Sequence, residues 1–175
     1  MLLYQKTIKK IKSGKSEFAE YLAKKVKKLS YVALSENNIE DKEWQAKINL
    51  HRKRRPKYWK LIETTDLINT LKKEEGPLLI DSIGGFVMKS IKKEQNEWST
   101  KMNSLMSLLI RRKSITIIVG EQVGWSLVSE YKIGNTYIER IGELQKRITK
   151  ISKDNWVAIN GRAIKIDEIS LEIPN

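Results

Sequence analysis

The sequence predicts an α/β fold with a mainly parallel sheet flanked by helices, in one domain over residues 1–175. Short apolar runs alternate along the chain with longer helical patterns, as they do in strand and helix repeats around a parallel sheet. The length suits one domain that buries roughly two thirds of its unfolded surface. No internal repeat, low-complexity linker or clear boundary divides the chain.

Six short apolar runs are the expected strands: residues 2–4, 31–34, 78–81, 115–120, 156–159 and 163–166. Between the first two, Phe18, Leu22 and Val26 recur every four residues, which predicts a helix over residues 16–28 with one buried stripe. A second helix is expected over residues 41–54, because acidic residues favour its start near Asp41 and Pro56 stops it.

Two later segments carry apolar side chains at helical spacing and predict packing helices over residues 95–112 and 133–151. These side chains are Trp98, Met102, Leu105, Leu108 and Leu109 in the first, and Tyr137, Ile141, Leu144 and Ile148 in the second. Asn160 and Gly161 separate the last two strands, and both residues tolerate positive φ. We therefore expect an antiparallel hairpin that closes one edge of the sheet.

Composition sets limits on location and chemistry. The chain has no cysteine, which excludes disulfides and thiolate metal sites. It has no stretch near the ~20 apolar residues of a membrane span, and its first residues lack the apolar core of a signal peptide. These observations predict a soluble, cytoplasmic protein.

The net charge is +13 and the isoelectric point is near 9.8, which favours attraction to polyanions. The lysines are, however, spread through predicted helices, as at residues 24–28, 72–73 and 92–93, rather than gathered in one stripe. We expect no specific nucleic-acid partner, and a basic nucleic-acid-binding module remains an alternative.

The tetrapeptide Ser13-Gly14-Lys15-Ser16 is a candidate phosphate-binding loop, since it follows an apolar start and opens a helix. In that context backbone N–H groups, the helix dipole, a lysine and a magnesium-binding hydroxyl converge on phosphates. The full motif also has glycine at position 9, where this chain has lysine. The run Lys9-Lys10-Ile11-Lys12 is therefore expected to distort or cover the loop. A chance match or a helix cap is the alternative.

Residues 77–81 are an apolar run that ends in Asp81. Such a run places a carboxylate at the C-terminal edge of a buried strand, beside a magnesium ion. A strand that ends in an ordinary polar residue is the alternative. With Lys15 and Ser16 upstream, the pattern favours nucleotide chemistry in which Ser16 and Asp81 are the metal ligands.

His51 is the only histidine, and it opens the run His51-Arg52-Lys53-Arg54-Arg55-Pro56, with Trp59 just beyond. Imidazole titrates near neutrality without perturbation. Four neighbouring cations can hold a polyphosphate and favour the neutral ring, which is a nucleophile for a nucleotide α-phosphate. In the alternative, His51 packs beside Trp44 and Ile48 on one face of its helix.

These motifs occur in an order that resembles the bifunctional adenosylcobinamide kinase/adenosylcobinamide-phosphate guanylyltransferases. The resemblance runs from about Ser13 to Ile166, and its most specific part is the segment from His51 to Trp59. The other segments that carry it are residues 13–20, Tyr31-Val32-Ala33, Glu63 with Asp66-Leu67, Asp81-Ser82 and Val123-Gly124.

The resemblance implies a P-loop (RecA-like) fold and two reactions. ATP or GTP, with Mg²⁺, phosphorylates the side-chain hydroxyl of adenosylcobinamide, and a histidine then passes GMP from GTP to that phosphate. His51 is the implied nucleophile, and the family implies a homotrimer. The implied nucleotide-binding residues are Lys9, Lys10, Ile11, Lys12, Ser13, Gly14, Lys15, Ser16, Ala33, Leu34, Ser35, Arg52, Lys53, Arg54, Arg55, Glu63 and Asp81.

The roles of Glu63 and Asp81 stay open, as nucleotide or metal carboxylates. A carboxylate suits guanine because it accepts hydrogen bonds from N1–H and the 2-amino group together.

Several residues depart from the family pattern. Lys9 and Lys10 replace paired glycines, and Glu121-Gln122 stands where Asn-Glu is usual. Further departures are Lys89 for asparagine, Ser126 and Ser129 for glycine and proline, and Asn135 and Ile138 where arginines are expected. These changes spare the fold and favour one alternative function, a degenerate homologue that binds nucleotide or corrinoid with one or both activities lost.

Overall fold

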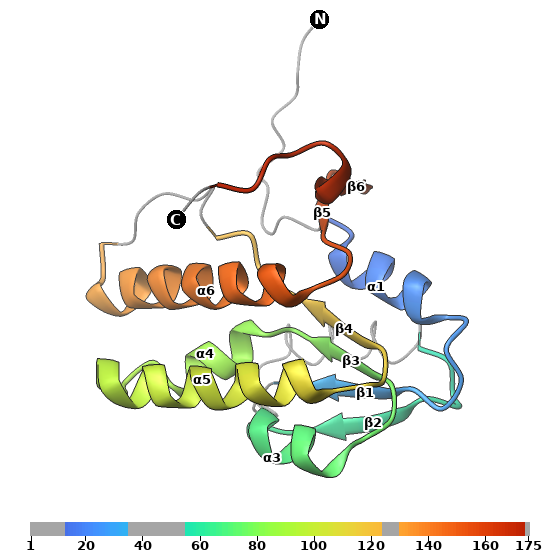
Figure 1. Cartoon of the computed structure of the whole chain (residues 1–175), viewed down its shortest axis with the longest axis horizontal. Coiled ribbons are helices and arrows are strands. Elements are labelled where there is room, and N and C mark those ends of the chain that lie inside the picture. Colours follow the sequence, from blue (N-terminus) through green and yellow to red (C-terminus); the bar gives the residue numbers. More distant parts are fainter. Residues whose placement is uncertain (1–12, 35–54, 124–129, 174–175) are drawn as a thin grey trace, which may run out of the picture.

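The computed structural model describes residues 13–34, 55–123 and 130–173. A four-stranded parallel sheet lies at the centre (Figure 1), in the order β2-β1-β3-β4. The strands are β1 (Ser30–Ala33), β2 (Lys60–Glu63), β3 (Leu78–Asp81) and β4 (Thr116–Val119). This arrangement confirms the expected α/β, P-loop type of fold, with its parallel sheet flanked by helices.

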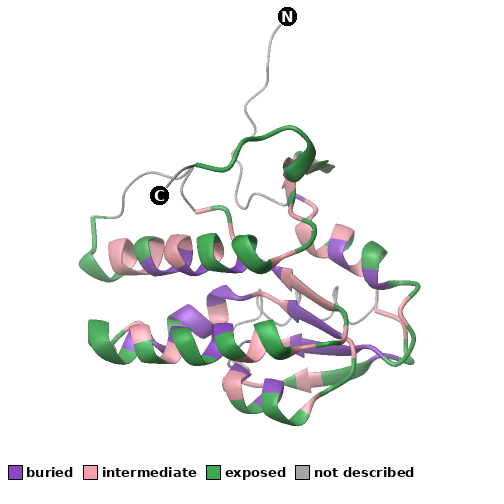
Figure 2. Cartoon of the chain, viewed as in Figure 1, coloured by how far each residue is buried: buried purple, intermediate pink, exposed green. Residues whose placement is uncertain are grey.

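Alternate strand residues enter two separate hydrophobic cores. Val32 and Ile80 belong to one core, whereas Tyr31 and Leu79 belong to the core on the other face. The pleat of a strand sends successive side chains to opposite faces, and parallel strands are usually covered on both. Figure 2 shows the buried residues gathered on the strands and on the helix faces beside them.

Four helices contribute to the core of one face, and α1 (Lys15–Ala23) contributes to the other. The four are α3 (Leu67–Lys73), α4 (Gly84–Lys89), α5 (Gln95–Arg111) and α6 (Lys132–Ile151). Helices α5 and α6 confirm the two expected packing helices, since Trp98 and Leu144 are fully buried.

The sequence prediction for α1 is wrong in its length and in its buried face. The helix ends at Ala23 instead of reaching residue 28, and Leu22 is 38% exposed. Ala19 and Ala23 are the residues of α1 that are buried. Because alanine has the smallest buried side chain, this face lets α1 lie close to β3 and β4, which it contacts.

Four described elements were not predicted from the sequence, one of which is the short 3₁₀ helix η1 (Ile166–Glu168). Strand β2 carries an exposed lysine and an exposed glutamate, so its apolar run is too short to stand out. Helix α3 is only seven residues long. Helix α4 opens with Gly84 and Gly85, a pair typical of loops, yet a Cβ atom on Gly85 would meet the Leu34 carbonyl oxygen at 1.8 Å. The close packing of α4 against Leu34 therefore explains the glycine at position 85.

The C-terminal hairpin forms as expected but does not extend the main sheet. Strands β5 (Trp156–Ile159) and β6 (Arg162–Lys165) pair antiparallel in a sheet of their own, which corrects the expectation that they close an edge. The turn at Asn160 and Gly161 has positive φ at both residues. The hairpin instead lies by α1, where the Gly161 N–H donates to the Ser13 carbonyl at 3.1 Å.

Other predictions lie outside the described residues, namely the strand at 2–4 and the helix at 41–54. Among the helices that are described, none has the length and apolar character needed to cross a membrane.

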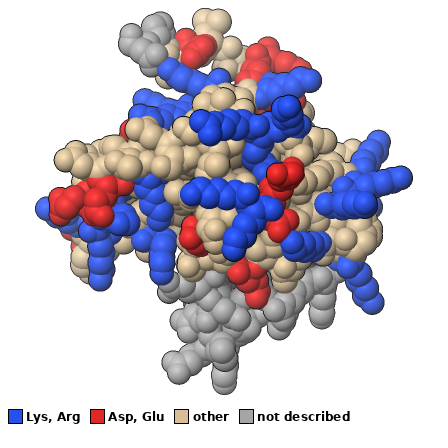
Figure 3. All heavy atoms as spheres, turned by 60° about the horizontal axis from the view of Figure 1, so that its bottom comes forward, with Lys and Arg blue, Asp and Glu red and all other residues tan. Residues whose placement is uncertain are grey.

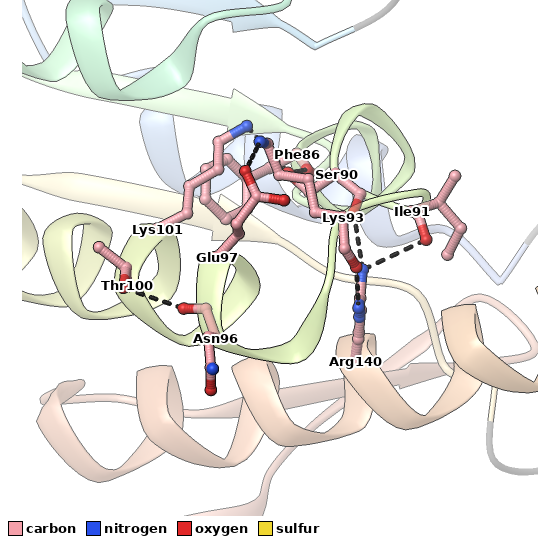
Figure 4. A network of polar contacts seen from close by, with 9 residues as sticks. All are labelled: Phe86, Ser90, Ile91, Lys93, Asn96, Glu97, Thr100, Lys101 and Arg140. Carbon is pink, nitrogen blue, oxygen red and sulfur yellow. Dashed lines mark hydrogen bonds and ion pairs between the residues drawn. The ribbon is translucent and has the colours of Figure 1, made fainter.

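Arg140 joins α6 to the chain between α4 and α5 (Figure 4). Its guanidinium donates to the carbonyls of Ser90 at 2.6 Å, Ile91 at 3.3 Å and Lys93 at 2.6 Å. It also lies over the ring of Trp98, with Cζ 5.3 Å from the centroid. Arg140 is 7% exposed, so one buried cation donates to three backbone carbonyls, of which that of Ser90 also accepts from the Lys93 N–H at 3.0 Å.

Replacing Arg140 with methionine is expected to lower the free energy of unfolding by about 2–4 kcal/mol, because the three carbonyls lose a charged donor. Arg147→Met is the matched control, since Arg147 lies on the same helix and its side chain is 43% exposed. That change is expected to cost under about 1 kcal/mol. Urea unfolding measures both, and equal losses would contradict the role given to Arg140.

Candidate functional site

The Ser13–Ser16 segment forms the start of α1. Gly14 has φ 90°, a left-handed conformation that glycine adopts without steric cost, and the helix begins at Lys15. The Lys15 ammonium donates to the Ser13 hydroxyl at 3.3 Å, so it lies back over the segment. The first N–H groups of α1 and the Lys15 ammonium therefore lie together, as an anion-binding helix start requires.

Three predicted site residues lie in register at the carboxyl edge of the sheet. Ala33 is in register with Glu63 on one side and with Asp81 on the other. All four strands are parallel, so their carboxyl ends share one edge, and ligands of such sheets bind outside that edge. Leu34, also predicted to line the nucleotide, follows β1 and is buried.

Asp81 is held by a tyrosine that sequence reasoning did not assign to the site. The Tyr31 hydroxyl donates to Asp81 Oδ2 at 2.6 Å. Burial and the neighbouring Asp81 carboxylate raise the pKa of Tyr31 well above its usual range. The phenol therefore stays protonated and remains the donor, and one oxygen of Asp81 has a fixed partner.

Glu121 is a second carboxylate that sequence reasoning missed as a site residue. Its Oε1 accepts a hydrogen bond from the Ser82 hydroxyl, and its Oε2 accepts one from the Gly84 N–H at 3.1 Å. Burial raises the pKa of Glu121, while the charge of Lys15 acts to lower it. The sequence signal that could have identified Glu121 is the one that identified Asp81, namely an apolar run followed by an acidic residue.

Only the end of the basic run falls within the described residues. The predicted site residues that lie outside the described part of the chain are Lys9, Lys10, Ile11, Lys12, Ser35, His51, Arg52, Lys53 and Arg54. Arg55 is described, and its Cζ lies 3.5 Å from the centroid of the Tyr31 ring. Trp59 also stacks on Tyr31, with the two ring centroids 6.5 Å apart. Arg55 and Asp81 therefore both contact Tyr31.

The positive charge is dispersed on the face that Figure 3 shows. Lysines and arginines occur over most of this face, with acidic side chains between them. A polyanion groove needs cations in one continuous stripe. The view therefore fits the interpretation of the lysines as a solvated surface.

No described helix, strand or loop brings together three or more histidine, cysteine or acidic side chains able to hold a metal. Mg²⁺ commonly takes one or two carboxylates and completes its shell with phosphate oxygens and water. The predicted protein ligands of Mg²⁺ are Asp81, which ends β3, and Ser16, which lies in the first turn of α1.

Replacing Glu121 with glutamine is expected to change how stability depends on pH. Because burial raises the pKa of Glu121, the free energy of unfolding of the natural chain falls as the pH rises from the usual carboxyl range through the raised pKa. The variant lacks this loss. Relative to the natural chain it gains about 1.4 kcal/mol for each unit that separates the folded and unfolded pKa values.

Urea unfolding at several values between about pH 4 and about pH 8 measures this difference. Glu75→Gln is the control, because Glu75 is exposed. Parallel stability curves for Glu121→Gln and the natural chain would contradict the expectation.

Comparison with known proteins identifies the family of the chain. A family model described as "Cobinamide kinase / cobinamide phosphate guanyltransferase" matches residues 10–166. A protein of Escherichia coli (strain K12) named "Bifunctional adenosylcobalamin biosynthesis protein CobU" is 24% identical, and the alignment covers 89% of this chain and 94% of that protein. The protein of the same name from Salmonella typhimurium is 22% identical with the same coverage. The chain therefore belongs to the cobinamide kinase / cobinamide phosphate guanyltransferase family.

Proposed function

We propose that this chain catalyses two steps of cobalamin nucleotide-loop assembly. The first phosphorylates the side-chain hydroxyl of adenosylcobinamide, and the second transfers GMP from GTP to that phosphate. Family membership over residues 10–166 supports both steps. The observation that carries the proposal most directly is the shared edge of Ala33, Glu63 and Asp81, with Arg55 joined to Asp81 through Tyr31.

In the kinase step, Ser13–Ser16 binds the β- and γ-phosphates. The N–H groups at the start of α1 and the Lys15 ammonium face the phosphate oxygens. The Ser16 hydroxyl and Asp81 would hold Mg²⁺, which when bound neutralises developing charge on the phosphates. The acceptor hydroxyl attacks the γ-phosphorus and releases its proton to water, the bond to the bridging oxygen breaks, and a nucleoside diphosphate leaves.

In the transfer step, a neutral nitrogen of His51 attacks the α-phosphorus of GTP and pyrophosphate leaves. The phosphate of adenosylcobinamide phosphate then attacks the same phosphorus and the P–N bond breaks, which regenerates His51. Arg52, Lys53, Arg54 and Arg55 stabilise the negative charge of the transferring group.

A carboxylate at the sheet edge gives the preference for guanine. Glu63 ends β2 and Asp81 ends β3, and either side chain can accept from N1–H and the 2-amino group of guanine. We propose Glu63, at the end of the edge strand β2, for the guanine contact, and Asp81, at the end of the buried strand β3, for the metal.

A second candidate is a degenerate homologue that binds nucleotide or corrinoid without completing both reactions. The observations that favour it are Lys9 in place of a glycine, Gln122 in place of a glutamate and Ile138 in place of an arginine. A nucleic-acid-binding module has weaker support, because its only argument is the net charge of +13. Steep salt dependence of DNA binding, without a preference for GTP, would identify that module.

We further propose that the protein is a single cytoplasmic domain that assembles as a homotrimer. The proposal of a trimer rests on the family resemblance alone. Light scattering behind size-exclusion chromatography measures the mass in solution, and a monomer would contradict it.

His51 is expected to carry GMP after incubation with GTP and Mg²⁺. Intact-mass analysis should show the added nucleotide on the natural chain and none on His51→Ala. The adduct should be lost in mild acid and survive mild base, because a P–N bond behaves in this way. Equal labelling of both proteins would remove His51 from the mechanism.

Restoring the paired glycines is expected to raise the kinase rate more than the transfer rate. The grip on the β- and γ-phosphates uses backbone N–H groups in a geometry that glycine permits, whereas guanylyl transfer relies on His51 and its cations. Lys9→Gly with Lys10→Gly could raise phosphorylation of adenosylcobinamide ~10²-fold if the donors are misaligned in the natural chain.

The two half-reactions are assayed separately, with Lys113→Gly, at an exposed position between α5 and β4, as a control for added backbone freedom alone. Strong kinase activity in the natural chain, with no gain from the two glycines, would show that the loop accommodates Lys9 and Lys10.

A further inference from the structure

Tyr31 is a polar residue in the buried centre of the sheet, and it contacts two residues of the proposed site. It lies in β1 between β2 and β3 and is 1% exposed. Its hydroxyl donates to Asp81 Oδ2 at 2.6 Å, and its ring faces the guanidinium of Arg55 at 3.5 Å. One side chain therefore joins the end of β3 to the end of the basic run.

The position of Tyr31 is set by its surroundings. Strand β1 pairs with a neighbour on each side, and the ring packs in the core that α1 helps to form. Trp59 stacks nearly parallel to it, at an interplanar angle of 21°. A residue confined in this way has little freedom, so its hydroxyl and its aromatic face stay in fixed places.

The two contacts of Tyr31 use different chemistry. The hydroxyl makes a charge-assisted hydrogen bond to a carboxylate, which fixes the rotation of the Asp81 side chain. The ring attracts the guanidinium through its negative face. Among the described residues, Arg55 Nε is buried without a hydrogen-bond partner, and the face of the Tyr31 ring lies against the same guanidinium.

We propose that Tyr31 is a positioning residue that fixes Asp81 and Arg55 relative to one another. The hydroxyl orients the carboxylate, and the ring orients the last arginine of the segment that begins at His51. This proposal rests on the proposed function, because it assigns Asp81 and Arg55 to that site. It also predicts that the two contacts can be separated by substitution.

Four variants separate them. Tyr31→Phe removes the hydroxyl and keeps the ring, whereas Tyr31→Leu removes both contacts. Asp81→Asn and Arg55→Ala show which half-reaction depends on each partner. Tyr58→Phe is the matched control, because the Tyr58 hydroxyl is exposed and donates only to the Lys24 carbonyl at 3.4 Å.

In the half-reaction that Asp81→Asn impairs most, Tyr31→Phe should lower kcat ~10-fold to ~10²-fold, as expected for a misplaced reacting group. Added to Asp81→Asn, it should cost less than ~2-fold more, because its effect passes through that carboxylate. In the half-reaction that Arg55→Ala impairs, Tyr31→Leu should lower the rate more than Tyr31→Phe does. Tyr58→Phe should match the natural chain.

Urea midpoints check that each variant is folded. The inference is overturned if folded Tyr31→Phe keeps full activity in both half-reactions, or if its effect multiplies with that of Asp81→Asn.

A natural chain without either activity would count against the proposed function and not against Tyr31. In that case, calorimetry of GTP and Mg²⁺ binding to the same variants tests the inference about Tyr31. Weaker binding by Tyr31→Phe, not additive with Asp81→Asn, supports the inference. Unchanged binding, or no binding by the natural chain, overturns it.

Discussion

Burial of β1 and β3 on both faces is the constraint on which the rest of the structure depends. Val32 and Ile80 fill one core, and Tyr31 and Leu79 fill the other. A slip of one residue in either strand would exchange these sets, which two packed cores do not allow. The register therefore carries Asp81 to the same face as Tyr31, and the hydrogen bond between them follows from packing of the whole sheet.

The sequence predicts a helix or strand well when the buried residues of that element form a clear apolar pattern, and poorly when they do not. Strand β3 was predicted with its observed bounds because Leu78, Leu79 and Ile80 are all buried. Strand β2 was not, since it lies at the edge and only Ile62 is partly buried. The same reasoning explains α1, whose buried alanines carry little apolar signal beside the larger but exposed Leu22.

A site residue could be predicted where its own side-chain chemistry suggests a role. It could not be predicted where its role depends on the residues around it in the fold. Asp81 could be found because an acid ends an apolar run. Tyr31 could not, because an aromatic residue within a strand looks like core until its hydroxyl partner is known. Arg140 lies two positions beyond the expected arginine at 138, on the buried side of α6, and there it serves Ser90, Ile91 and Lys93. Two positions along an α-helix correspond to about 200°, so Arg140 lies on a different face of α6 from residue 138.

The contact between the hairpin and Ser13 has a consequence for how the chain is made. The Gly161 N–H that meets the Ser13 carbonyl comes from nearly the far end of the described chain. During synthesis, the sheet and α5 can be complete while this donor is still unmade. A contact between such distant residues is also slow to form, because a long loop must close first. The start of α1 is thus made before the rest of the described structure and is among the last parts to reach its final surroundings.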